Sequence, residues 1–174
     1  MARSPASRAD QLQHPLLTTG GLLAETHAGL LVTAERQLEA ETGLTVQWFD
    51  LLIRLARTPE HRLRMTDLAA QTTLSPSGLT RAVDRLCDAG LVERQACPTD
   101  RRSTYAVLTP DGEKRIRHAV PGHVAQLEAI FDGFTAEEID TFTELLRRVR
   151  DVTNPCAAQA STPEGLGDVP PGGG

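Results

Sequence analysis

Residues 65–108, MTDLAAQTTLSPSGLTRAVDRLCDAGLVERQACPTDRRSTYAVL, decide the fold of this chain. The stretch opens with a short apolar-periodic segment, and a polar turn follows at residues 71–74. Ser75 with Pro76 then starts a second helix, because a serine oxygen satisfies free N–H groups and proline favours the first helical position. Gly90 is typical of a residue just past a helix end. The order predicts two short helices joined by a tight turn.

Two extended segments follow the second helix. Residues 91–94 and 103–108 are expected to be strands, and the polar, charged segment 98–102 lies between them. Two short strands around a charged tip predict a β-hairpin. Together with the two helices, the hairpin makes a winged helix-turn-helix, in which the second helix enters the DNA major groove.

The chain on both sides of this unit has helical apolar periodicity. Apolar residues recur at helical spacing from Leu23 to Leu38, and again after Thr109-Pro110 to about Arg150. A winged unit of roughly 60–70 residues has too little surface to cover these stripes, since that size is already marginal for one core. The expected fold class is mainly α with a small β-hairpin wing, in which N- and C-terminal dimerisation helices flank the winged helix-turn-helix domain.

The expected organisation has five segments. They are a flexible N-terminal arm at 1–17, an N-terminal dimerisation helix at 18–44, the winged helix-turn-helix DNA-binding domain at 45–108, C-terminal dimerisation helices at 109–152 and a disordered tail at 153–174. The tail is rich in proline and glycine, so it has little apolar surface to offset the entropy of ordering. Pro121 should bend the helix that contains it, because proline removes an internal hydrogen bond.

The charge distribution favours a nucleic-acid partner at the centre of the chain. Residues 61–117 hold ten Lys/Arg against seven Asp/Glu, within a chain of formal net charge −5. Nearly all the positive charges are arginines, whose planar fork suits phosphates and guanine edges. No apolar run approaches the roughly 20 residues of a membrane helix. The N-terminus also lacks the pattern of a signal peptide, so we expect a cytoplasmic protein with no membrane partner.

Motifs of catalysis and cofactor binding are missing from the sequence. It has no supported Ser–His–acid arrangement, no glycine-rich phosphate loop and no metal-ligand cluster. His118 and His123 are five residues apart and straddle Pro121, which is a poor match to two ligands on one helix face. Three cysteines at unrelated spacings suggest neither a disulfide framework nor a zinc module. We expect a protein that is not an enzyme and has no catalytic residue, metal or cofactor.

The second helix of the motif separates an apolar face from a polar one. Leu79, Val83 and Leu86 fall at i, i+4 and i+7 and are expected in the core. The residues expected to bind DNA are Ser75, Ser77, Thr80, Arg81 and Arg85 on this helix, Arg94 after it, and Arg101 and Arg102 at the wing tip. Hydroxyls near a helix N-terminus suit a phosphate, and arginines suit base edges and a narrow minor groove.

An alternative interpretation makes the helix arginines a solvated surface. In that case Arg81 and Arg85 would pair with Asp84 or Asp88. The charged hairpin tip beside the helix favours DNA binding over this alternative. Asp100 would be unusual at a DNA surface unless it orients a neighbouring wing arginine.

Five segments resemble the MarR family of transcriptional regulators. They are MTDLA at 65–69, LSPSGLTR at 74–81, DAGLVER at 88–94, DRRS at 100–103 and LTPDG at 108–112. The resemblance runs from about Leu22 to Arg150. It implies a homodimer with interlocking terminal helices that binds a palindromic operator in double-stranded DNA, often near its own gene. It also implies that a small molecule or an oxidant releases the DNA.

The resemblance further assigns roles to single residues. Ser77, Thr80, Arg81 and Arg85 would meet the major groove. One of Arg101 and Arg102 would enter the minor groove while the other pairs with Asp100, and the sequence leaves open which does which.

The resemblance also implies a site for a small-molecule effector, between the dimer helices and the winged domain. The candidate lining residues are His27, Trp48 and Arg54. The alternative is that Trp48 only packs in the core.

Two other functions fit the same scaffold. One is a thiol-based redox-sensing regulator that uses Cys97, because nearby cations can lower a thiol pKa. The other is a protein-interaction module without DNA binding. A module that does not bind DNA does not require arginines on both the helix face and the wing.

Overall fold

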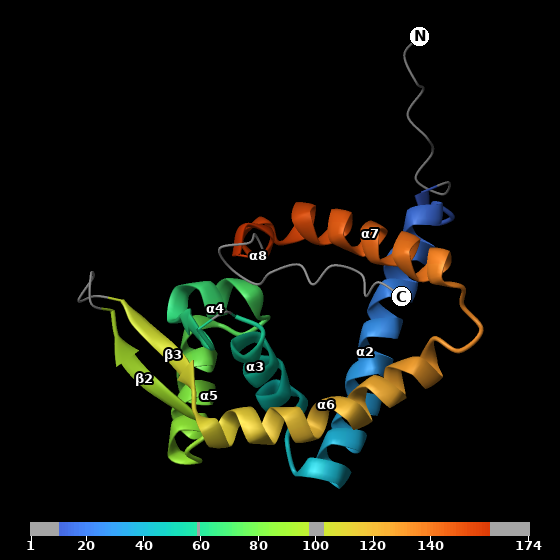
Figure 1. Cartoon of the computed structure of the whole chain (residues 1–174). Coiled ribbons are helices and arrows are strands. Elements are labelled where there is room, and N and C mark those ends of the chain that lie inside the picture. The colour runs from blue at the N-terminus through green and yellow to red at the C-terminus, as the bar shows by residue number, and fades with distance from the viewer. Residues whose placement is uncertain (1–10, 59, 98–102, 161–174) are drawn as a thin grey trace.

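The computed structural model describes residues 11–58, 60–97 and 103–160. The helices are α2 (Pro15–Thr42), α3 (Val46–Ala56), α4 (Met65–Gln71), α5 (Pro76–Asp88), α6 (Pro110–Ile130), α7 (Ala136–Thr153) and α8 (Pro155–Ala160), and the strands are β1 (Arg62–Arg64), β2 (Val92–Ala96) and β3 (Thr104–Leu108). Figure 1 shows β2, β3, α4 and α5 at one end of the molecule and α2 at the other, with α6 and α7 running between the two ends. The mainly helical winged architecture is as predicted.

The helix starts follow the sequence signals. Ser75 Oγ accepts a hydrogen bond from the backbone N–H of Gly78 at 3.1 Å, and Thr109 Oγ1 accepts one from Gly112 at 3.0 Å. Each cap is followed by proline at the first helical position. Gly43 ends α2 with a φ of 66°, a left-handed conformation that glycine adopts without steric cost. These caps place α5 and α6 where the sequence predicts them.

The strands form one antiparallel sheet in the order β1-β3-β2. The predicted hairpin is confirmed, with Val92 opposite Leu108 and Ala96 opposite Thr104. Strand β1 is an addition that the sequence analysis does not predict. It has only three residues, too few for an alternating pattern, and pairing with β3 forms it.

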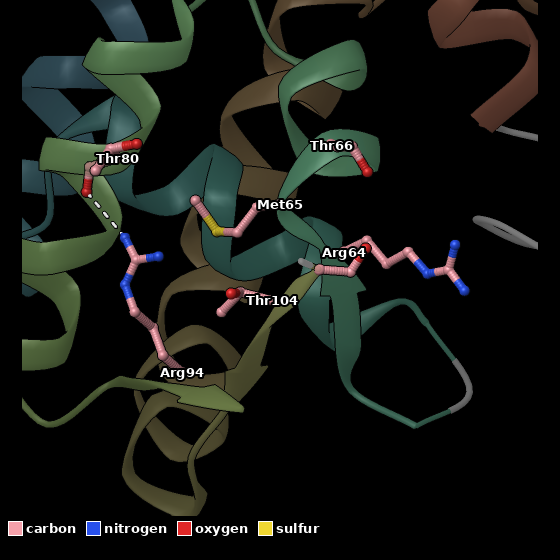
Figure 2. Close-up of a pocket in the computed structure, with 7 residues that line it drawn as sticks. Arg64, Met65, Thr66, Thr80, Arg94 and Thr104 are labelled. Atoms are coloured by element: carbon pink, nitrogen blue, oxygen red, sulfur yellow. Dashed lines mark hydrogen bonds between the residues drawn. The ribbon is translucent and has the colours of Figure 1, made fainter. Parts of the chain in front are cut away.

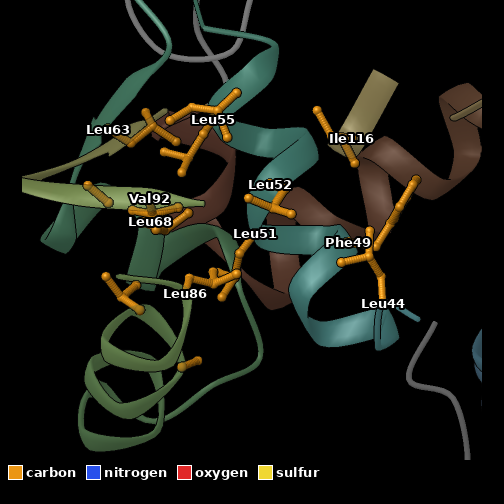
Figure 3. Close-up of a cluster of buried hydrophobic side chains, with 14 of the residues drawn as sticks. Leu44, Phe49, Leu51, Leu52, Leu55, Leu63, Leu68, Leu86, Val92 and Ile116 are labelled. Atoms are coloured by element: carbon orange, nitrogen blue, oxygen red, sulfur yellow. The ribbon is translucent and has the colours of Figure 1, made fainter. Parts of the chain in front are cut away.

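A single buried cluster joins α3, α5 and the sheet. Leu79, Val83 and Leu86 are each exposed by 1% or less, as predicted. In the cluster, Leu86 lies beside Leu51 of α3 (Figure 3). The core therefore holds α5 by one face and leaves its opposite face at the surface.

Helix α6 runs from the winged domain to α2. It continues through Pro121, and its ribbon changes direction near the middle, as the proline predicts (Figure 1). The helix packs closely on α2, since a Cβ at Gly122 would collide with the side chains of Gln37 and Glu41. This contact fixes α2 to the winged domain.

Two terminal boundaries differ from the prediction. Helix α2 begins at Pro15, inside the arm predicted at 1–17, because His14 Nδ1 accepts the N–H of Leu16 at 3.2 Å and caps it. Helix α8 lies inside the tail predicted at 153–174. Its six residues are too few to be stable alone, so it depends on packing against α4. Residues 1–10 of the predicted arm and residues 161–174 of the predicted tail lie outside the described residues.

Large apolar side chains remain at the surface of the long helices. On α7 no residue is buried, although Phe142, Leu145, Leu146 and Val149 fall at helical spacing. On α2, Leu16, Leu17, Leu22, Leu23, Leu31 and Val32 are also exposed. Of the helices in the described ranges, none is long and apolar enough to cross a membrane.

Candidate nucleic-acid interface

The exposed face of α5 presents the predicted polar side chains. Ser77, Thr80, Arg81 and Arg85 are all exposed. Thr80 Oγ1 donates to the carbonyl of Pro76 at 3.0 Å, so its lone pairs stay available to accept hydrogen bonds. Within the described ranges, neither Arg81 nor Arg85 forms an ion pair. Their guanidinium groups are therefore open to an external anion or base edge.

Arg94 is engaged with the protein itself. Arg94 lies on β2, and its Nη2 and Nε donate hydrogen bonds to Asp84 Oδ1 on α5, at 2.9 and 3.2 Å. Its Nη2 also lies 3.4 Å from the carbonyl oxygen of Thr80. The sequence predicts that Arg94 binds DNA. In the structure its guanidinium points toward α5, the predicted recognition helix (Figure 2).

A polar pocket of about 210 Å³ separates α5 from the base of the wing. Its lining residues are Arg64, Met65, Thr66, Thr80, Arg94, Ser103 and Thr104. Five elements of the winged domain, β1, α4, α5, β2 and β3, thus bring hydroxyls and arginines to the lining of one pocket (Figure 2). Such donors suit a phosphate oxygen.

Arg64 is a candidate that the sequence analysis does not identify. Its Nε donates to the hydroxyl of Tyr105 at 3.3 Å, and its guanidinium lies 5.9 Å from the centre of that ring. The hydrogen bond to Tyr105 raises the pKa of Arg64. Tyr105 holds the side chain in place without a formal negative charge. Only the pairing of β1 with β3 brings the two residues together, and a three-residue strand gives no sequence signal.

Strands β2 and β3 form the predicted hairpin of the wing. Its tip residues Asp100, Arg101 and Arg102 lie outside the described residues, so their roles stay predictions. Ser75, the remaining predicted DNA contact, is exposed at the start of α5 and lies 3.3 Å from Ser77 between the two hydroxyl oxygens.

Comparisons with known proteins identify the architecture. The model of the MarR family matches residues 42–103, which contain α3, α4, α5 and β2, the first strand of the hairpin. The crystal structure of Sco3205, a MarR family transcriptional regulator from Streptomyces coelicolor, in complex with DNA, superposes with a TM-score of 0.72 at 35% identity. The match covers 82% of this chain and 92% of Sco3205. The chain belongs to the MarR family.

Two other relatives extend the comparison. The HTH-type transcriptional repressor YetL of Bacillus subtilis is 31% identical over 107 residues, which are 62% of this chain and 64% of YetL, so the match spans less than two thirds of that relative. CouR from Rhodococcus jostii RHA1, solved bound to p-coumaroyl-CoA, superposes with a TM-score of 0.69 at 26% identity. That match covers 79% of this chain and 92% of CouR.

A second pocket lies at the other end of the recognition helix of this MarR protein. It has a volume of about 460 Å³ and is lined by Trp48, Ala89, Leu91, Asp111, Lys114, Arg115 and His118. Trp48 lines this pocket, and its role in effector binding stays a prediction. His27 and Arg54 do not line it, because His27 is exposed on α2 and Arg54 pairs with Asp50 along α3 at 2.8 Å.

The cysteines and histidines occupy packed or isolated positions. Cys97 is only 3% exposed, and its Sγ lies 3.9 Å from the hydroxyl of Tyr105. Burial raises the pKa of Cys87, which favours the unreactive thiol. His123 packs on Phe49 with 4.6 Å between ring centres. Across the described ranges, no group of three His, Cys, Asp or Glu is placed to hold a metal ion.

Proposed function

We propose that this protein is a DNA-binding transcriptional repressor of its own or neighbouring genes. The observation that carries the proposal is the exposed face of α5. There Ser77, Thr80, Arg81 and Arg85 project above the buried row of Leu79, Val83 and Leu86. Arginine in bidentate contact with guanine is the commonest specific contact in the major groove. The DNA complex of Sco3205 and the repressor YetL support the same function.

The DNA-bound form is a homodimer in this proposal. The apolar side chains on α2 and α7 would be costly in water, since burial of one such side chain contributes about 1.5–3 kcal/mol. A second copy that supplies the same surface would cover them. Two recognition helices related by a two-fold axis require two half-sites of inverted sequence, so the operator would be a palindrome.

A small molecule releases the operator in this proposal, and CouR with its bound p-coumaroyl-CoA supports the idea. The Trp48 pocket has a volume of 460 Å³, inside the range of small-molecule sites. Ala89, directly after α5, and His118 of α6 both line it. A ligand there would touch the recognition helix at its C-terminal end and could shift it.

Selection of binding sites from fragments of the source genome tests the proposal. The purified protein should enrich a palindromic sequence with half-sites about one helical turn apart. Compounds that compete with this DNA should lose their effect when Trp48 is replaced by Ala. Equal binding to all fragments would contradict the proposal and favour the protein-interaction module. Loss of DNA binding in peroxide, restored by a thiol reductant, would favour the redox sensor.

A further inference from the structure

The pair formed by Asp84 and Arg94 links the recognition helix to the wing. Asp84 lies on the exposed face of α5, with Arg81 three residues before it and Arg85 one residue after it. Arg94 lies on β2, the first strand of the wing. Two of its nitrogens bond to one carboxylate oxygen at 2.9 and 3.2 Å. The pair therefore joins the two parts of the domain that meet DNA in the proposed function.

The pair also accounts for an acidic side chain on a surface that faces DNA. A free carboxylate among DNA-binding arginines would repel phosphates. Here the guanidinium of Arg94 neutralises it. The same guanidinium reaches back to the carbonyl of Thr80, so its contacts on α5 span one helical turn.

We propose that Asp84 and Arg94 are positioning residues that set the orientation of α5 relative to the wing and so contribute to operator specificity. The inference rests on the proposed function. Leu79, Val83 and Leu86 hold the inner face of the helix, while the ion pair holds its outer edge. A bidentate base contact tolerates little change in side-chain position, so a small rotation of α5 weakens specific contacts more than phosphate contacts.

The variant Asp84→Asn separates positioning from simple charge. It removes one negative charge from a DNA-facing helix and keeps the shape of the side chain. Electrostatics alone predicts tighter binding to every DNA, because phosphate repulsion falls. The positioning role predicts operator binding weaker by about three- to fivefold, the scale of an exposed ion pair, with random-DNA binding unchanged or tighter.

Asp88→Asn is the matched control. It removes the same charge from the same helix, and among the described residues Asp88 has no ion-pair partner. It should leave the ratio of operator to random-DNA affinity unchanged. Arg94→Gln should lower that ratio as Asp84→Asn does, and the double variant should lower it no further than either single variant. Melting temperatures within a few degrees of wild type would show that all variants fold.

Four results would overturn the inference. Tighter binding of Asp84→Asn to operator and random DNA alike would make Asp84 only a repulsive charge. A salt slope reduced by about 0.9 in Arg94→Gln, with additive losses in the double variant, would make Arg94 a phosphate contact. Wild-type protein without any sequence preference would overturn the proposed function, and the inference with it. If the wild type prefers operator over random DNA and Asp84→Asn keeps the same ratio of affinities, the inference alone would be overturned.

Discussion

At the residue scale, the close approach of α6 to the wing depends on Gly112. A Cβ there would collide with the carbonyl oxygen of Leu91 and approach Leu108. The carbonyl belongs to the backbone, so the clash cannot be relieved by a side-chain rotation. The position tolerates no side chain because α6 starts directly against the first residues of the wing.

Gly112→Ala should therefore lower the free energy of unfolding by about 1–3 kcal/mol, the usual cost of overpacking. Denaturant titration of the variant measures the loss. Lys114→Ala, an exposed substitution two residues further along α6, is the control and should change stability by less than about 0.5 kcal/mol. A Gly112→Ala protein as stable as wild type would show that α6 can move away from the wing.

His123 makes stability depend on pH. Burial against Phe49 lowers its pKa below the ordinary 6.5, and its buried Nδ1 has no hydrogen-bond partner among the described residues. The imidazole of His123 therefore binds a proton more readily in the unfolded chain than in the folded one. Neutral His123 makes its full contribution to the free energy of unfolding above pH 6.5. This contribution is lost as the pH falls toward the folded-state pKa.

Unfolding free energies measured between pH 8 and pH 5 should thus fall on acidification in the wild type. His123→Leu should reduce that slope, because the titrating group is removed. His118→Gln changes an exposed histidine of the same helix and should keep the wild-type slope. An unchanged slope in His123→Leu would assign the pH dependence to other groups.

At the element scale, the sequence predicts those helices whose capping residues are next to the helix start in the chain. The Ser75-Pro76 and Thr109-Pro110 starts are local, since a cap forms within three residues of chain. The buried row and the exposed row of α5 follow from its periodicity. The candidate DNA-binding side chains of this helix are therefore predictable from sequence alone.

Long-range contacts account for what the sequence does not predict. Strand β1 exists because β3 pairs with it, and this pairing carries Arg64 to Tyr105. The bond from Arg94 to Asp84 likewise depends on where β2 falls beside α5. Neither contact leaves a periodic pattern in the chain.

Helix α8 is the element whose role is easiest to test. Asn154 Nδ2 donates to the carbonyl of Ala70 on α4 at 3.3 Å, and Ala157 is 7% exposed. A chain ending at Thr153 should lose this contact and melt at a lower temperature than a chain ending at Ala160. Calorimetry of the two truncated proteins makes the comparison. Equal melting temperatures would show that the tail is dispensable from Thr153, as its composition alone suggests.

At the scale of the whole molecule, the surface of α7 predicts a dimer. Leu145 is 49% exposed and lies in the apolar stripe of a helix without a buried residue. Leu145→Glu should convert a particle of twice the chain mass into one of 18.8 kDa, because a charge would replace an apolar contact. Light scattering at micromolar concentration reports the mass. Glu144→Lys, on the opposite side of α7, is the control and should stay dimeric.

The central claim is that α5 distinguishes one DNA sequence from another. Titration of wild type and Arg81→Ala on operator and random DNA, at several salt concentrations, tests it most directly. We expect Arg81→Ala to lose about 1–3 kcal/mol on operator and much less on random DNA, since a base contact is removed. The wing variant Arg101→Ala/Arg102→Ala should weaken both and lower the salt slope by roughly 0.9 for each lost phosphate contact. If both variants bind operator as tightly as wild type, the DNA-reading surface is not the exposed face of α5 and its wing.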